Sequence, residues 1–256
     1  MRKALRIISL LIVICIFFSA CTSTPQKEIT SNDGYTPNTD YNEKYKLRDK
    51  KDLYTMYEPE DIVTMYLTVS TGNEAENTNH TWNEVNTYSV YDYEDMGVDR
   101  YKVEGLLQIG DESGPLPGNL GYNQVSPNCT IQIRGQSSSR QPIKNYKISL
   151  KDNKGTWMGN TSIPLNKHVN EGLRFRNKMA YDLIKDIDEM MGLRTRFVHL
   201  YVKDTTDGGN NKFTDYGLYT YVEQPNKKML KAHGLDANGH FYKINEFEFY
   251  RYEDDH

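Results

Sequence analysis

The sequence predicts an α+β domain that is rich in strands in its first half and contains one main helix. Between residues 62 and 150, apolar and polar residues alternate in several short runs, which is the period of half-buried strands. Beyond residue 150 the period changes, and apolar residues recur at helical spacing between residues 173 and 187. The 20 tyrosines of the chain suit strands that are buried on one face and wet on the other.

Residues 1–20 are expected to be a secretory leader and not part of the fold. A basic start is followed by the apolar run Ile7–Phe18, which is too short for a mature spanning helix, and then by two small residues. The four residues that end in Cys21 resemble the bacterial lipobox, with Phe in place of the usual Leu. We therefore expect the chain to be exported and lipid-anchored through Cys21 to the outer face of the cell membrane. A leader cleaved without lipidation and a retained membrane helix are the alternatives.

Residues 21–52 are rich in Ser, Thr, Asn, Asp, Pro and Lys, which is the composition of a disordered tether, so the domain is expected to cover residues 53–256. Loss of Arg2, Lys3 and Arg6 with the leader would take the net charge from −4 to −7. An acidic chain without basic clusters argues against nucleic acid as a partner. Cys129 is the one cysteine beyond the leader and Cys21, and the six histidines are scattered, so neither a disulfide framework nor a metal site is predicted.

The elements before the main helix are strands separated by loops. A long loop, rich in Gly and Pro, is expected at Gly110–Pro127. The expected strands are Ile62–Val69, Tyr88–Tyr93 and Lys102–Ile109, followed by two more within Ile131–Leu150.

The stretch Ile131–Leu150 is predicted to be a long hairpin whose tip binds a phosphate or another oxyanion. Gly135 permits unusual backbone angles, and short hydroxyls and fixed positive charges lie close to it. Backbone N–H groups, hydroxyls and cations together suit an anionic ligand. A solvated hairpin tip is the alternative. The residues concerned are Arg134, Gly135, Ser137, Ser138, Lys144 and Lys147.

The main helix is predicted from Asn170, a plausible N-cap, to just before Gly192, and its apolar face should share a core with the strands. On this helix Arg174, Asn177 and Tyr181 are spaced to form one polar stripe. The elements that follow are strands Arg196–Val202 and Tyr216–Glu223, a short helix Lys227–Ala232, a turn at Asp236–Gly239 and a strand Phe241–Ile244.

Three stretches in sequence order resemble the spore coat protein H (CotH) kinase-like family. They are Ile133-Arg134-Gly135-x-Ser137-Ser138 with Tyr146-Lys147-Ile148, Leu173-Arg174-Phe175-Arg176-Asn177 with Ala180-Tyr181-Asp182-Leu183, and Arg194–Val198 leading to Tyr216–Tyr219 and Val222–Lys227. The resemblance covers roughly Val125–Lys243. It implies an atypical protein-kinase-like fold with a strand-rich N-terminal lobe, in a family whose secreted or surface members phosphorylate proteins such as spore coat components with ATP and Mg²⁺ or Mn²⁺.

The resemblance also suggests roles for individual residues. The turn from Arg134 to Ser138 would take the place of a glycine-rich phosphate loop. Lys147 is the first candidate for a phosphate-binding lysine and Lys144 the second, and an exposed strand charge is the alternative for Lys147. Arg174 and Asn177 would reach toward the phosphates or pair locally, Asp182 would pair with the lysine, and the backbone of Glu223 would hold adenine at a hinge.

The sequence also departs from the kinase pattern. It has no GxGxxG loop, no Walker A loop and no HRD-like or DFG-like motif. The family's catalytic and metal-binding aspartates follow the Val222–Asn226 segment in a stretch that is missing here, so we expect a first lobe and hinge that is truncated before the catalytic lobe, with catalytic residues unknown. Two functions remain open: ATP-dependent phosphorylation of secreted or surface proteins if the full domain is present, or a non-catalytic surface lipoprotein that binds a protein or glycan partner. A hydrolase has little support, because Ser137–Ser139 lack a GxSxG setting.

Overall fold

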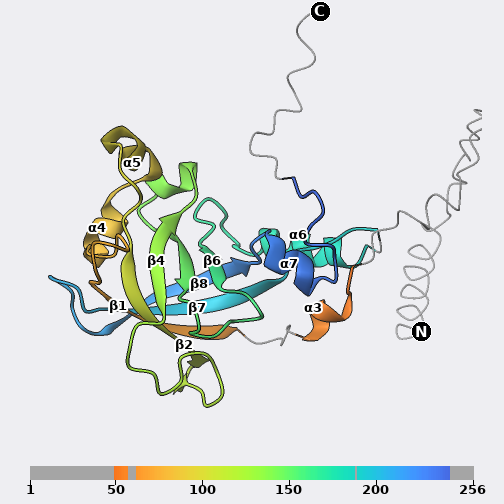
Figure 1. The fold of residues 1–256 in the computed structure, drawn as a ribbon, viewed down its shortest axis with the longest axis horizontal. Coiled ribbons are helices and arrows are strands. Elements are labelled where there is room, and N and C mark those ends of the chain that lie inside the picture. Colours follow the sequence, from red (N-terminus) through yellow and green to blue (C-terminus); the bar gives the residue numbers. More distant parts are fainter. Residues whose placement is uncertain (1–48, 57–61, 188, 243–256) are drawn as a thin grey trace, which may run out of the picture. The chain divides into compact units, whose positions relative to one another are not determined.

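The computed structural model describes residues 49–56, 62–187 and 189–242 (Figure 1). The predicted leader, Cys21 and most of the predicted tether lie outside these residues. The helices are α3 (Asp52–Met56), α4 (Trp82–Thr87), α5 (Val90–Met96), the 3₁₀ turn η1 (Ser137–Arg140), α6 (Arg176–Lys185) and α7 (Lys227–Ala232). The strands are β1 (Val63–Ser70), β2 (Val103–Asp111), β3 (Gly114–Pro115), β4 (Cys129–Arg134), β5 (Asn145–Leu150), β6 (Ser162–Asn166), β7 (Thr195–Asp204) and β8 (Phe213–Val222).

The strands form one sheet in the order β1-β7-β8-β6-β5-β4-β2-β3, and β1 also pairs with β2. This last pairing closes the sheet on itself. The pair β1–β7 is parallel and the others are antiparallel. The architecture is therefore the predicted α+β class, with a strand-rich body and few helices.

The core lies inside the closed sheet. Strand side chains alternate between the two faces, and the inward ones are fully buried, for example Leu67, Ile131, Ile148 and Leu200. Helices α4 and α5 lie at one end of the sheet, whereas α3, α6 and α7 lie at the other (Figure 1). Trp82 of α4 and Tyr93 of α5 join the core at their end.

Most predicted strands are confirmed with shifts of a few residues: β1, β2, the β4–β5 hairpin, β7 and β8. Strand β6 was not among the predicted strands, and Pro164 lies in its middle, where a proline is unusual. The proline is tolerated because β8 pairs with β6 only at Leu165 and Asn166.

The predicted strand Tyr88–Tyr93 is wrong, since residues 82–96 form the two short helices α4 and α5. Each helix begins with a capping box, in which the N-cap side chain and the third helical residue exchange hydrogen bonds. Thr81 and Glu84 do this for α4, and Ser89 and Asp92 for α5. These local bonds outweigh the strand preference of the aromatic and β-branched residues in the same stretch.

Helix α6 is shorter than predicted, and the expectation that it shares the core is wrong. The helix starts at Arg176, because Arg174 has a left-handed backbone with φ of 57° and Phe175 takes the N-cap position. None of its residues is buried, and Leu183 is 62% exposed. At and just beyond its C-terminal end, the Lys51 ammonium donates to the carbonyl oxygens of Lys185, Ile187 and Met190 at 2.7–3.0 Å.

Helix α7 is confirmed at its predicted bounds, and Asn226 caps it by accepting from the N–H groups of Lys228 and Met229. Its apolar side packs in a small second cluster with Ala237. Phe241 and Tyr242 are not in a strand, and the rest of that predicted strand lies outside the described residues. In the part of the chain that the structure describes, no helix is both long enough and apolar enough to cross a membrane.

Candidate functional site

A polar cavity of about 500 Å³ lies where four parts of the domain meet. These are the tip of the β4–β5 hairpin, the segment after β6, helix α6 and the end of β8. The volume falls within the roughly 300–1,000 Å³ of small-molecule sites. Its lining consists of Arg134, Ser138, Asn145, Asn166, His168, Val169, Asn170, Glu171, Asn177, Tyr181, Leu193, Val222, Glu223, Gln224 and Pro225.

The hairpin contributes the positive charge of the cavity. Arg134 is the last residue of β4 and projects from the outer face of the sheet, because the alternating Ile131 and Ile133 point into the core. Its Nη1 donates to the side-chain oxygen of Asn166, which leaves the rest of the guanidinium donor fork for a ligand. Burial lowers the pKa of Arg134, although a guanidinium still remains protonated in proteins.

The turn that carries Ser138 depends on a glycine. Gly135 has φ of 92°, a left-handed conformation that other residues rarely adopt. A Cβ atom at this position would lie 2.2 Å from Ser138 Oγ. That hydroxyl accepts a hydrogen bond from Asn145 Nδ2 at 3.0 Å, so glycine, serine and asparagine fix the hairpin tip together.

The opposite side of the cavity contains two buried polar atoms without a hydrogen-bond partner among the described residues, His168 Nε2 and Asn177 Oδ1. An unpaired buried polar atom is costly unless a ligand or water satisfies it. Burial lowers the pKa of His168, which favours its neutral form. Glu171 accepts from the backbone N–H of Arg176 at 2.8 Å and so holds the start of α6 against the cavity. The arrangement suits a polar ligand that can complete these bonds.

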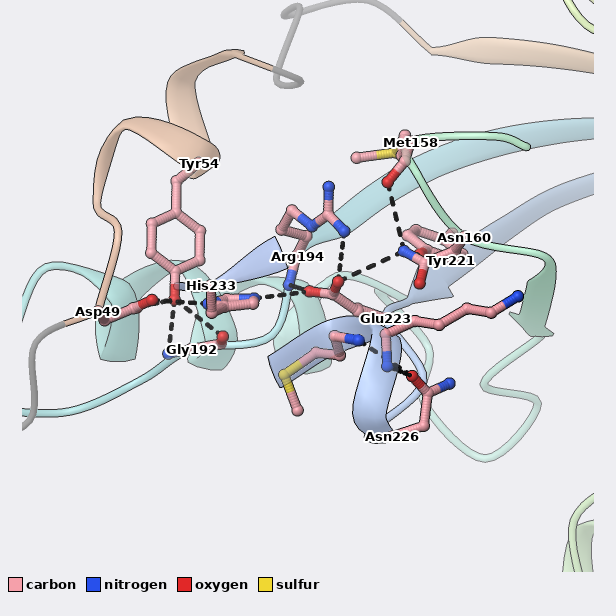
Figure 2. Close-up of polar contacts among 12 residues, drawn as sticks. Asp49, Tyr54, Met158, Asn160, Gly192, Arg194, Tyr221, Glu223, Asn226 and His233 are labelled. Carbon is pink, nitrogen blue, oxygen red and sulfur yellow. Dashed lines mark hydrogen bonds and ion pairs between the residues drawn. The ribbon is translucent and has the colours of Figure 1, made fainter. Parts of the chain in front are cut away.

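The third side of the cavity is formed by Leu193 and Val222–Pro225. The Glu223 carboxylate is turned away into a buried network, where it accepts from Arg194, His233 and Asn160 (Figure 2). Burial raises the pKa of Glu223, but the hydrogen bonds and charges of His233 and Arg194 outweigh this and lower it to about 2. The Glu223 N–H donates to the Arg194 carbonyl at 2.8 Å, so the backbone group that Glu223 has left to offer a ligand is its carbonyl oxygen.

Four of the nine residues predicted to bind phosphate or nucleotide line this cavity: Arg134, Ser138, Asn177 and Glu223. Gly135 supports it as described above. The remaining four, Ser137, Lys144, Lys147 and Arg174, are not in the lining.

The two candidate lysines have different surroundings. Lys144 is buried, and its Nζ donates to the Ser139 carbonyl at 2.6 Å, where it holds the hairpin tip together. Burial lowers the pKa of Lys144. Lys147 lies on the outer face of β5 opposite Gln132. Asp182, expected beside a phosphate lysine, instead pairs with Lys178 at 2.8 Å within α6.

Several lining residues were not singled out from the sequence. Asn166 and His168 come from β6 and the segment after it, and this strand was itself not predicted. Asn145 lies directly opposite Arg134 in the hairpin register. Aligning the two predicted strands as a hairpin pair could therefore have identified it. Among the described residues, no group of three or more His, Cys, Asp or Glu side chains is placed to hold a metal ion.

A comparison with protein-family models gives a match over residues 131–256 to the family described as CotH kinase protein. A search of curated proteins gave no match. The matched stretch begins in β4 and includes the hairpin tip, α6 and the Val222–Pro225 segment, and so every lining residue of the cavity falls within it. The resemblance seen in the sequence is thereby confirmed: residues 131–256 of this chain match the model of the CotH kinase protein family.

Proposed function

We propose that this chain is a kinase-like protein that binds ATP in the cavity, together with Mg²⁺ or Mn²⁺, and phosphorylates secreted or surface proteins. The observation that carries the proposal is the convergence of Arg134 and Ser138 from the hairpin with Asn177 from α6. These residues come from two separate family-like stretches of sequence, and one polar cavity brings them together. The match to the CotH kinase protein family supports a kinase-like function.

The residues present fit a triphosphate. A guanidinium forms paired hydrogen bonds with phosphate oxygens, and its charge opposes theirs. In this proposal Arg134 binds the phosphates and the Ser138 hydroxyl donates to them. The side-chain amide of Asn177 lies in the same lining, and the unpaired Nε2 of His168, in the tautomer that is protonated there, donates to the phosphates. ATP supplies the phosphoryl group, whereas the chain holds and orients it, which is the main protein contribution in phosphoryl transfer.

The Val222–Pro225 wall is the place we propose for the base. Leu193, Val222 and Pro225 offer apolar surface, and the Glu223 carbonyl can accept from an amino group. For the divalent ion the described residues do not provide a ligand cluster, so we assign it no protein ligands.

The cellular setting belongs to the same proposal. The basic start, the apolar run and the four residues ending in Cys21 support export and lipid attachment to the outer face of the membrane. A lipid anchor would place the domain beside surface proteins, which are the substrates that the proposal names.

Isothermal titration calorimetry of the full-length chain with ATP, with and without Mg²⁺ or Mn²⁺, tests the proposal. We expect Arg134→Gln to weaken ATP binding about tenfold or more, because it removes a charge-assisted contact. Arg140→Gln is the matched control. It makes the same change in the same hairpin, but Arg140 is exposed and stacks 3.9 Å over the Tyr91 ring, outside the cavity.

The variant Lys147→Ala separates two locations for the phosphates. If it abolishes binding while Arg134→Gln does not, the phosphates lie beside Lys147, outside the cavity lining, and our cavity assignment is wrong. If the wild-type chain binds no ATP under any condition, the nucleotide proposal itself is wrong.

The second candidate is a non-catalytic surface protein that binds a protein or glycan partner. The observation in its favour is a row of aromatic rings on the outer face of the sheet. Tyr66 stacks on Tyr201 with ring centroids 5.5 Å apart, and Phe213 meets Tyr66 edge-on and is 46% exposed. Glycan-array binding that is lost in Tyr66→Ser, in a chain that does not bind ATP, would favour this candidate.

A further inference from the structure

Four ionisable side chains form a fully buried network directly behind the Val222–Pro225 wall. Asp49, Arg194, Glu223 and His233 have side chains that are at most 1% exposed. They come from four separate segments: the residues before α3, those before β7, those after β8 and the end of α7 (Figure 2). Buried charges are retained only when they are paired and hydrogen-bonded, so this network has a definite arrangement.

The imidazole of His233 stands between two carboxylates. Its Nδ1 lies 2.7 Å from Asp49 Oδ1, and its Nε2 lies 3.0 Å from Glu223 Oε2. A neutral imidazole has one N–H and one lone pair, so it can donate to only one of them. With both carboxylates ionised, this geometry requires the doubly protonated form, in which each ring nitrogen donates to a carboxylate.

The surroundings of His233 reinforce this charge state. Asp49 also accepts from the Tyr54 hydroxyl at 2.5 Å, and the Tyr54 ring meets the imidazole edge-on. On the other side Arg194 binds Glu223, and the lysines of α7 itself are exposed. Burial lowers the pKa of His233, but the bonds and charges of Glu223 and Asp49 outweigh it and raise the pKa above its ordinary value of 6.5.

The network is continuous with the cavity wall. Glu223 belongs to the wall, and Arg194 directly follows the lining residue Leu193. The wall is followed directly by α7, which begins after Asn226, and His233 is the C-cap residue of that helix. His233 thus holds the wall from behind through Glu223, and Asp49 holds His233 in turn.

We propose that His233 is a positioning residue for the cavity. It fixes the Val222–Pro225 wall while its imidazole is charged and releases the wall when the proton is lost. This inference rests on the proposed nucleotide function. Protonated His233 stabilises the folded wall, because a group whose pKa is raised on folding contributes stability fully below its unfolded value, and that contribution is lost as pH rises through the folded value. ATP binding should therefore weaken as pH rises through the raised pKa of His233, which lies above 6.5.

ATP affinity of the full-length chain, measured by calorimetry from about pH 6 to about pH 9, tests the inference. The terminal phosphate of ATP also titrates near the start of this pH range. The informative quantity is therefore the difference in ATP affinity between wild type and variant at each pH. We expect His233→Gln to bind about tenfold more weakly than wild type at the acidic end and equally at the alkaline end. His199→Gln, which disrupts an exposed histidine–carboxylate pair with Asp215, should follow the wild-type curve.

A nuclear magnetic resonance titration keeps the test decisive if His233→Gln does not fold. We expect the ring nitrogens of His233 to be both protonated at neutral pH, and the amide signal of Gln224 in the wall to shift as His233 loses its proton. Asp49→Asn, which removes one of the two carboxylates, should move this transition to lower pH while leaving the cavity lining unchanged.

The two proposals fail differently. If the chain binds no ATP at any pH, the nucleotide function is wrong. The nuclear magnetic resonance titration then still shows whether the Gln224 amide responds to the protonation of His233. A His233 that is neutral throughout, or a Gln224 amide that does not respond to it, overturns the positioning role even if ATP binds. Equal pH profiles for wild type and His233→Gln overturn it as well.

Discussion

At the scale of single residues, Asn128 shows how one side chain replaces a missing strand partner. Strands β2 and β4 pair only from Val103 to Gly105, and the pairing stops before Leu107. There the amide of Asn128, which is fully buried, accepts from the Leu107 N–H at 2.8 Å and donates to the Leu107 carbonyl at 2.9 Å. The side chain thus satisfies two backbone groups that would otherwise be buried without partners.

We predict that Asn128→Ala lowers the free energy of unfolding by about 3 kcal/mol, because it leaves both Leu107 groups unpaired. Urea denaturation of the two chains measures this difference. Gln124→Ala is the control: Gln124 is exposed, its contact with Asn128 is peripheral, and we expect a change within about 0.5 kcal/mol. Equal effects of the two substitutions would contradict this role of Asn128.

Individual site residues could be predicted from sequence where a motif and a strand period coincide. Arg134 and Ser138 were found in this way, because Gly135 marks the turn and the alternation of isoleucines fixes the face of Arg134. Asn166 and His168 could not be predicted as site residues, since their place in the cavity depends on the pairing of β6 with β8 and not on any local pattern. The left-handed backbone conformation of Arg174, which sets the start of α6, could not be predicted from the spacing of apolar residues either.

At the scale of elements, the short helices α4 and α5 depend on their caps. A helix of six or seven residues is too short to be stable by propensity alone. We predict that Ser89→Ala lowers the free energy of unfolding by about 1 kcal/mol, because the N–H of Asp92 loses its acceptor. Thr87→Ala, at the exposed end of α4, should change it by less than about 0.5 kcal/mol, and chemical denaturation compares the two.

Helix α6 has an apolar side with little to cover it among the described residues. Met179 and Leu183 of α6, and Leu173 and Ile187 just outside its two ends, are each more than 40% exposed. Exposed apolar clusters of this kind promote association. We predict that Leu183→Glu reduces self-association in light scattering while changing the free energy of unfolding by less than about 0.5 kcal/mol.

A buried leucine supplies the comparison for that prediction. Leu165→Ala in β6, which is fully buried, should cost about 2–5 kcal/mol. If Leu183→Glu destabilised the chain to a similar extent, α6 would have to be packed more tightly than the structure has it.

Elements with a clear two-residue alternation were predicted well, because that pattern reports directly on one buried face. The errors lie where another local effect decides. At Tyr88–Tyr93 the residues favour a strand, but a capping box stabilises the start of helix α5 there. In α6 the helical spacing of apolar residues predicted contact with the core, whereas that face is exposed. Helical spacing shows that a face is apolar, but it does not show what covers that face.

At the scale of the whole molecule, the closure of the sheet could not be predicted. It depends on two contacts between distant parts of the chain, the parallel pair of β1 with β7 and the antiparallel pair of β1 with β2. Strand patterns give the faces of a strand but not its neighbours. The sequence therefore predicted the strands and their class but not the order in which they join.

We predict that amide hydrogen exchange separates the closed sheet from the helix beside it. The amides of β1, β4, β5 and β7 should exchange most slowly, because they bond to strands around a buried core. Those of α6, which has no buried residue, should exchange much faster. Mass spectrometry of the exchanging chain measures both, and protection of α6 equal to that of β1 would count against this ranking.

The closed sheet also limits how this domain can recognise other proteins. Among the described strands, all except the two-residue β3 have a neighbour on each side. A partner or substrate peptide therefore finds few free strand edges to extend with an extra strand. One is the side of β8 before Thr220, because β6 pairs with β8 only at Thr220 and Tyr221. Elsewhere recognition has to come from side chains, at the polar cavity, the aromatic row or the apolar side of α6. There selectivity would depend on the chemistry of the partner's side chains and not on its ability to adopt an extended backbone.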